Sequence, residues 1–213
     1  MIIKKYGIEL HRLEHKDIEL VRQMRNKESI RSKMFYQEVI TEEMQEKWFK
    51  SIDNMYNYFF VIVYDGEKIG LINGKDVDFE ARTCEGGIFI WDEKYWFTGI
   101  PVQASICLIE LTFNIALLRK VYAHIREDNT ISLYYNKLLG YEQVTSQGEN
   151  THVLTAENYS NKAEKIKNLV MKQSKEKPLT MEDITFPDID EKLYLYKDLP
   201  EDVKETLRTK LPV

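Results

Sequence analysis

The chain has 213 residues, of which 43% are hydrophobic, enough for a buried core and too many for a disordered protein. A net charge of −5, with Lys and Arg spread along the chain, argues against nucleic acid as a partner. Two cysteines, no metal-ligand spacing, and no apolar stretch fit for a signal peptide or a membrane span favour a cytoplasmic protein without a metal.

The first 52 residues predict an extended segment followed by two helices. Residues Ile2–Leu13 are expected to be extended, and Asp17–Asn26 to form a helix. Thr41 is well placed to cap the next helix, because its side-chain oxygen can accept a hydrogen bond from the first turn. A stripe facing the core is expected at a spacing of four residues: Met44, Trp48 and Ile52.

The middle of the chain predicts a hairpin and a further strand. The strand Tyr58–Tyr64 is followed by Asp65-Gly66, a strong signal for a tight hairpin turn, and by a return strand over Lys68–Ile72. The next strand, Glu85–Trp91, is nearly all apolar, as is typical of a strand covered on both faces.

The segment from Thr98 to Pro101 leads into an apolar helix that should be buried, over Val102–Leu118. The first amides of a helix have no partner within the helix, so its start is suited to binding an anion such as a diphosphate. Gly99 would let the anion approach the backbone closely. The alternative is a plain connection that needs a glycine to turn.

The rest of the chain predicts short strands and helices. These elements are a strand over Val121–Ile125, a helix over Thr130–Leu139 ended by Gly140, strands over Tyr141–Val144 and His152–Leu154, and helices over Asn158–Lys175 and after Pro200. The change in composition near Ala156 divides the chain into a domain of residues 1–156 and an extension of residues 157–213 of unknown role. Together the elements predict a mixed α/β fold, with helices on the faces of a mixed, mostly antiparallel sheet.

Four segments, in their order and spacing, resemble the GNAT acetyltransferases. They are VRQMRN and ITEEMQEKWF near the start, the hairpin VIVYDGEKIGLI, the stretch EGGIFIWDEKYWFTGIPVQASICLIELTF, and the closing NTISLYYNKLLGY. The branch that they resemble most holds the ribosomal-protein N-terminal acetyltransferases and the amino-sugar acetyltransferases of the pseudaminic acid pathway. The resemblance implies the GNAT fold, and transfer of acetyl from acetyl-CoA to an amine in a ternary complex without a covalent enzyme intermediate.

The resemblance also implies where acetyl-CoA binds. The residues expected at the cofactor lie on the fourth family strand, the diphosphate loop and the closing helix: Ile88, Phe89, Ile90, Phe97, Thr98, Gly99, Ile100, Val102, Asn129, Tyr134 and Asn136. Asn129 matches the residue that bonds the pantetheine arm, although Asn is also a good helix N-cap. Trp96 and Pro101 depart from the basic and small residues usual in the loop, and Pro101 has no N–H to donate.

Three residues are candidates for proton transfer. Glu85 is the first candidate for the base that takes the proton of the amine, directly or through water, and His124 is the second. The alternatives are an exposed carboxylate and a structural histidine. Many family members carry a Tyr acid at the position of Asn136, so the neighbouring Tyr135 is a candidate acid that could equally be a packing residue.

The acceptor is expected beside Arg25, Asn26, Arg31 and Met34, where Arg suits a phosphate and Met34 could instead belong to the core. An amino-sugar nucleotide is the preferred acceptor, and a protein N-terminal amine is the alternative. A small-molecule amine is thus the expected partner, with a homodimer possible. The rival from another class is a non-catalytic CoA-binding or interaction module, which Asn136 and the altered loop favour.

Overall fold

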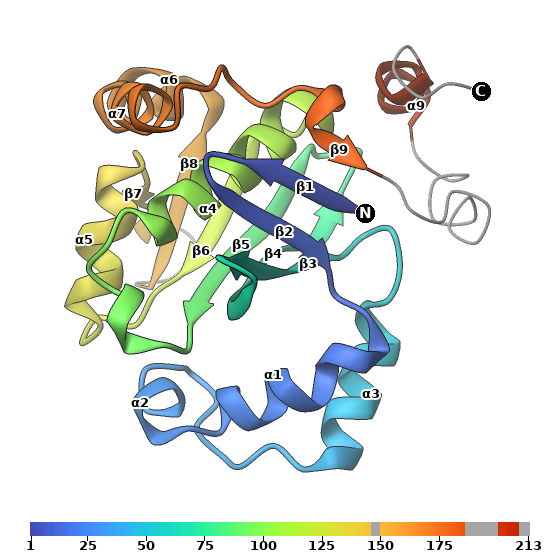
Figure 1. Cartoon of the computed structure of the whole chain (residues 1–213), viewed down its shortest axis with the longest axis vertical. Coiled ribbons are helices and arrows are strands. Elements are labelled where there is room, and N and C mark those ends of the chain that lie inside the picture. The colour runs from blue at the N-terminus through green and yellow to red at the C-terminus, as the bar shows by residue number, and fades with distance from the viewer. Residues whose placement is uncertain (146–149, 186–199, 209–213) are drawn as a thin grey trace.

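The computed structural model describes residues 1–145, 150–185 and 200–208, arranged around one nine-stranded sheet (Figure 1). Its strand order is β7-β8-β6-β5-β4-β3-β2-β1-β9. The strands are β1 (Ile2–Lys5), β2 (Ile8–Arg12), β3 (Tyr58–Tyr64), β4 (Glu67–Asp78), β5 (Thr83–Ile90), β6 (Lys120–His124), β7 (Glu142–Gln143), β8 (Thr151–Thr155) and β9 (Ile184–Thr185). Among these described strands β5 and β6 pair in parallel, and the other neighbours pair antiparallel.

Helices cover both faces of the sheet (Figure 1). They are α1 (Ile18–Arg25), α2 (Glu28–Arg31), α3 (Glu42–Ile52), α4 (Ile100–Glu110), α5 (Thr130–Leu138), α6 (Ala156–Lys162), α7 (Glu164–Ser174) and α9 (Glu201–Arg208). The group α1 to α3 packs on one face in a small core around Val61 and Phe49, while α4 fills the larger core on the other face. The expected mixed α/β architecture, a mostly antiparallel sheet with helices on its faces, is confirmed.

The hairpin β3–β4 begins as its sequence predicts. Asp65 and Gly66 have φ of 50° and 77°, the left-handed conformation that a tight two-residue turn needs. The return strand is longer than predicted, because β4 continues to Asp78 and pairs with β5 along most of its length.

The phase of α3 differs from the prediction. Thr41 caps this helix as expected, since its hydroxyl accepts a hydrogen bond from the Met44 amide at 3.2 Å. Trp48 and Ile52 pack half-buried against the core as expected, but the fully buried positions are Gln45 and Phe49, and Met44 is 38% exposed, so the prediction was wrong at Met44. The physical reason is tertiary: Phe49 packs edge-on against the His15 ring, with centroids 5.7 Å apart.

The C-terminal part of the chain is joined to the sheet. β9 pairs with β1 through Ile2↔Thr185 and Ile3↔Ile184. The helix expected over residues 158–175 is divided into α6 and α7 at the buried Ala163, and the apolar segment KLYLY lies outside the described residues. The division into residues 1–156 and 157–213 stays a prediction.

The C-terminal end of α4 carries a buried carboxylate. Glu110 is 2% exposed, and its Oε2 accepts hydrogen bonds from the Tyr6 hydroxyl at 2.8 Å and from the Leu179 amide at 2.7 Å. One carboxylate therefore links the N-terminal hairpin, the central helix and the segment that leads into β9.

Candidate active site

The two parallel strands part in the middle of the sheet. β5 and β6 are paired through Thr83↔Lys120, Cys84↔Val121 and Glu85↔Tyr122, but β5 continues to Ile90 paired only with β4 among the described strands. The backbone of residues 86–90 therefore has an open edge on the side of β6, where an extended ligand can add hydrogen bonds.

Glycine stands where the strands part. A Cβ on Gly86 would lie 2.8 Å from Cγ1 of Val121, too close for a real side chain. The half-buried predicted cofactor residues Ile88 and Phe89 and the buried Ile90 follow along the open edge. Val121 occupies the space beside Gly86, and Asn73 lies 3.0 Å from the place of a Cβ on the exposed Gly87, so glycine at both positions permits close packing on β5.

The start of α4 lies beyond the end of β5 and offers unpaired amides. Gly99 is the N-cap without a side-chain cap, and no acidic residue lies in the first turn. The Ile100 amide bonds Thr98 Oγ1 at 3.3 Å, whereas the amides of Gly99 and Val102 have no partner in the described part of the chain. A Cβ on Gly99 would meet no described atom within 4 Å, and Phe97 beside it is 81% exposed. This helix start is thus open to an anion.

The predicted residues of the closing helix α5 differ in how deeply they are buried. Asn129 is the N-cap, with its side chain accepting from the Ser132 amide at 3.2 Å, and Asn136 donates to the Ser132 carbonyl at 2.9 Å. Tyr134 is 67% exposed. The Tyr135 hydroxyl lies between α5 and α4, 2.7 Å from the Pro101 carbonyl oxygen and 2.6 Å from Ser105 Oγ.

The environment of Tyr135 bears on its predicted role as acid. Burial raises the pKa of Tyr135 well above its ordinary value, although its hydrogen bond with Ser105 acts in the opposite direction. The hydroxyl already has partners on α4, so it joins the two helices that flank the expected cofactor groove. Its part in proton transfer stays a prediction.

Glu85 lies in a charged cluster where the strands part. Alternation along β5 puts it on the face opposite the buried Cys84, toward α1 to α3. Its Oε2 is 3.0 Å from Lys75 Nζ and 3.7 Å from His124 Nε2. The other ring nitrogen of His124 lies 3.3 Å from Thr151 Oγ1. The structure thus brings both predicted bases together.

Lys75 completes this cluster. Burial lowers the pKa of Lys75, but its contacts with Glu85 and with Asp76, 3.2 Å away, raise it further, and the net pKa is above the ordinary value. Apart from His124, the cluster holds two carboxylates and one ammonium, whose formal charges sum to −1, and this favours a cationic ligand.

The four predicted acceptor residues border the segment of residues 32–40. Arg25 donates to the Tyr36 carbonyl and Arg31 to the Gln37 carbonyl, each at 2.9 Å. Asn26 exchanges two 2.8 Å hydrogen bonds with Ile40. Buried nitrogens of both arginines, Arg25 Nη1 and Arg31 Nε, have no hydrogen bond within the described residues. Arg25 is thus held by a backbone carbonyl, and Arg31 by a backbone carbonyl and by the Glu28 carboxylate at 2.5 Å; their contact with a substrate stays a prediction.

Met34, the fourth predicted acceptor residue, connects residues 32–40 to the sheet through a hydrogen bond. Met34 is half-buried, and its carbonyl accepts a 3.3 Å hydrogen bond from Arg126, which follows β6. Arg126 is held in turn by Asp128 at 2.6 Å. Sequence reasoning missed Arg126, because its partner lies 92 residues away along the chain.

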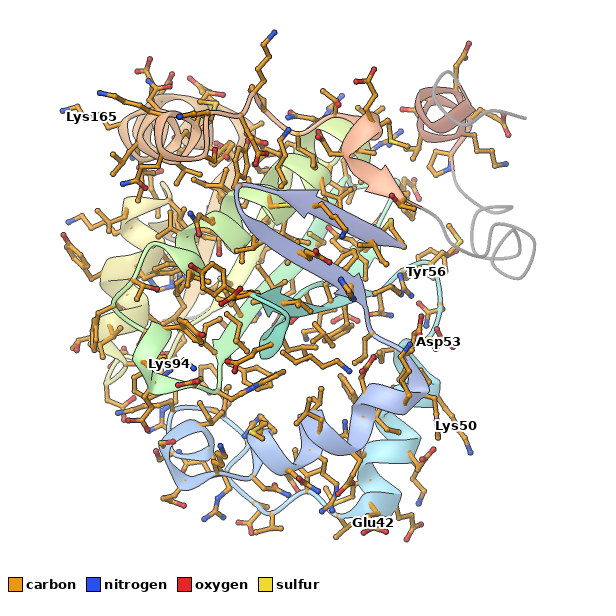
Figure 2. All side chains as sticks on the ribbon, viewed as in Figure 1. Glu42, Lys50, Asp53, Tyr56, Lys94 and Lys165 are labelled. Atoms are coloured by element: carbon orange, nitrogen blue, oxygen red, sulfur yellow. The ribbon has the colours of Figure 1, made fainter. Side chains whose placement is uncertain are left out.

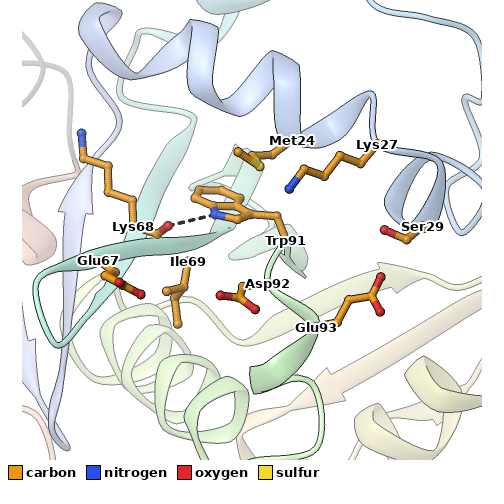
Figure 3. Close-up of a pocket in the computed structure, with 9 residues that line it drawn as sticks. All are labelled: Met24, Lys27, Ser29, Glu67, Lys68, Ile69, Trp91, Asp92 and Glu93. Carbon is orange, nitrogen blue, oxygen red and sulfur yellow. Dashed lines mark hydrogen bonds between the residues drawn. The ribbon is translucent and has the colours of Figure 1, made fainter.

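A polar cavity of about 480 Å³ lies beside the end of β5 (Figure 3). Its lining comes from α1 and α2, the start of β4 and the turn after β5: Met24, Lys27, Ser29, Glu67, Lys68, Ile69, Trp91, Asp92 and Glu93. The Trp91 indole donates to the Lys68 carbonyl at 2.8 Å and forms its wall. Lys94, labelled in Figure 2, pairs with Glu67 at 3.2 Å and Asp92 at 3.0 Å. Antiparallel pairing brings the start of β4 beside the end of β5, and this register is the sequence signal for the cavity.

Residues 1–145, 150–185 and 200–208 contain neither a metal-binding cluster nor a membrane-spanning helix. No group of three or more His, Cys, Asp or Glu there could hold a metal ion. None of the helices described is long and apolar enough to cross a membrane.

Comparison with known proteins gives one family and several similar structures. The model of the acetyltransferase (GNAT) domain matches residues 8–141. The spermidine N(1)-acetyltransferase of Escherichia coli (strain K12) is 26% identical over 150 residues, which cover 69% of this chain and 77% of that protein. Two solved structures are also similar to this chain.

A spermidine N-acetyltransferase from Vibrio cholerae, in complex with CoA and spermine, superposes with a TM-score of 0.63 at 19% identity, covering 73% of this chain and 99% of its own. A domain from Methanocaldococcus jannaschii DSM 2661 gives a TM-score of 0.61 at 21% identity, covering 70% and 97%. The expected kinship with the ribosomal-protein and amino-sugar branch is not supported, because the named relatives are spermidine acetyltransferases.

Proposed function

Because this chain belongs to the acetyltransferase (GNAT) family and is an acetyl-CoA-dependent N-acetyltransferase, we propose that its acceptor is a polyamine of the spermidine class. The observation that carries the proposal is the Glu85 cluster, which combines a carboxylate at the parting of β5 and β6 with a net negative charge. A polycationic amine is favoured there, and an anionic sugar nucleotide is not.

The residues of the open edge fit acetyl-CoA. We assign the diphosphate to the amides of Gly99 and Val102, and the pantetheine arm to the free edge of residues 86–90 with Asn129 nearby. The bound coenzyme supplies the activated acetyl group. The diphosphate would lie outside the sheet, and the acetyl end would lie between the strands.

Glu85 is the proposed base, with His124 and Lys75 as its neighbours. An ammonium must lose a proton before its nitrogen can attack, and Glu85 lies on the face that an amine reaches from α1 and α2. Lys75 lies 3.0 Å from Oε2 of Glu85, so the incoming cation must share this carboxylate with Lys75. A location in the cytoplasm and a homodimer stay predictions.

The test is release of CoA thiol from acetyl-CoA with a panel of amines. Spermidine and spermine should turn over, while an amino-sugar nucleotide and a peptide with a free N-terminal amine should not. Turnover with the sugar nucleotide or the peptide alone would contradict the polyamine proposal. Binding of CoA without turnover on any amine would favour the non-catalytic module.

A further inference from the structure

The proposed function requires a proton for the sulfur of CoA, and the residue at the expected place cannot supply it. Asn136 has an amide side chain that does not titrate in water, and it donates to the Ser132 carbonyl at 2.9 Å. A thiolate that leaves without a proton donor is a poorer leaving group, so an acid near the open edge of β5 would speed the reaction.

Tyr141, the residue before β7, lies beside the open edge of β5. It follows Gly140, whose φ of 96° turns the chain sharply after α5. A Cβ built on Gly86 would lie 3.3 Å from the Tyr141 hydroxyl oxygen. Gly86 is the first residue of β5 beyond its last pair with β6, so the hydroxyl lies against the point where the two strands part.

The Tyr141 hydroxyl differs from its tyrosine neighbours in having no partner. The hydroxyl of Tyr58 lies 2.9 Å from Thr112 Oγ1, and that of Tyr135 lies between Pro101 and Ser105. Tyr141 is 9% exposed, and its hydroxyl has no hydrogen bond in the part of the chain that is described. Within the described residues, this oxygen is not one of the fully buried atoms without a partner, so it is open to solvent and a ligand in the groove can reach it.

We propose that Tyr141 is the catalytic acid that protonates the sulfur of CoA, in place of the tyrosine absent at position 136. The inference rests on the proposed function. The amine nitrogen forms a bond to the acetyl carbon as the carbon–sulfur bond breaks, and the sulfur takes that electron pair and the hydroxyl proton of Tyr141. Glu85 passes the ammonium proton to water before the attack, then receives the second proton that the nitrogen loses as the amide forms and releases it to water as well. The phenolate regains a proton from water as CoA departs, so charge and protons balance.

The surroundings keep this acid protonated. Burial raises the pKa of Tyr141 far above the ordinary value, and the nearby Cys84 of β5 and Tyr135 of α5 act in the same direction. Burial likewise raises the pKa of Cys84 to about 11, and Tyr135 is also held neutral, so no charged side chain among these competes for the proton at neutral pH. On its other side Tyr141 lines a cavity of about 590 Å³, together with Glu142, Lys137, His152 and Lys162.

The first test uses Tyr141→Phe and does not require an acceptor. The absorbance of the bound CoA thiolate is titrated against pH in both proteins. A hydroxyl beside the sulfur stabilises the thiolate, so the variant should raise the pKa of bound CoA thiol by about 1. The same pKa in both proteins would overturn the proposal. A failure of wild-type protein to bind CoA would instead contradict the proposed function.

The second test measures turnover with the amine that the panel identifies. Tyr141→Phe should lower kcat on the order of 100-fold with little change in the KM of acetyl-CoA. Tyr58→Phe removes another buried hydroxyl of the same core and should leave kcat unchanged. Asn136→Tyr in the Tyr141→Phe background should restore part of kcat. Equal kcat for wild type and Tyr141→Phe would overturn the assignment.

Discussion

The two ends of α4 differ in whether their polar groups have partners within the protein. At the N-terminal end, the Gly99 and Val102 amides have no partner in the described chain, and the glycine faces open space. At the C-terminal end, Glu110 is buried and bonded by Tyr6 and Leu179. One helix therefore has an end that is left open for a ligand and an end that the protein closes with its own chain.

This difference separates binding from stability within a single element. Hydrogen bonds that a folded chain satisfies internally stabilise it whether or not a ligand is present. Donors that stay open contribute only when the ligand arrives, which makes them a source of affinity. Changes at the two ends of α4 should consequently act on different measurements.

The largest effect is expected at the closed end. Glu110→Ala leaves the Tyr6 hydroxyl and the Leu179 amide without an acceptor and creates a cavity, so the free energy of unfolding should fall by about 3–5 kcal/mol. Denaturant unfolding checks this, with the exposed Glu80→Ala as control. The CoA affinity of the protein that remains folded should be unchanged, and a loss of affinity equal to that at the open end would break the comparison.

At the open end the effect should fall on affinity. Gly99→Glu places a negative charge and bulk against the diphosphate and removes charge-assisted hydrogen bonds of about 1.5–3 kcal/mol each, so CoA should bind on the order of 100-fold more weakly. Calorimetric titration with CoA measures this. Gly99→Ala is the matched control: its φ is −71° and the added methyl meets open space, so affinity and stability should both persist. Unchanged affinity in Gly99→Glu would refute the location of the diphosphate.

The smallest effect concerns the buried thiol behind the open edge. Burial raises the pKa of Cys84 from 9.0 to about 11, so the folded state holds this proton more tightly than the unfolded state does. Its contribution to stability is complete below pH 9 and is lost as the pH rises toward about 11, by up to about 2.7 kcal/mol. Unfolding curves of wild type and Cys84→Ala across this range should converge. A parallel decline in both proteins would show that Cys84 is accessible to water.

Local signals in the sequence predicted the open end of α4. Pro101 in the first turn, Gly99 before it and the apolar run after it define a buried helix with a bare start, and they do so within a few residues. The turn at Asp65-Gly66 and the cap at Thr41 were predicted for the same reason. The parting of β5 and β6 was not predicted, because it depends on the pairing of two strands that are separated by α4 along the chain.

The closed end could not be predicted, because its contacts join distant parts of the chain. Glu110 stands 104 residues from Tyr6 and 69 from Leu179, and in the sequence it is merely a polar interruption of an apolar helix. The phase of α3 and the backbone partners of Arg25 likewise depend on packing against other elements. Periodicity describes one element at a time and carries no information about these pairings.

The pairing of β1 with β9 has a consequence for synthesis on the ribosome. Ile3 of β1 emerges more than 180 residues before its partner Ile184, and Leu179 becomes available to the Glu110 carboxylate only shortly before Ile184 does. Until then the nascent chain has a sheet edge without its neighbour and an ionisable group without its donors, a state prone to association with other chains. Synthesis of the segment from Leu179 to β9 therefore completes the hydrogen bonding of residues made long before it.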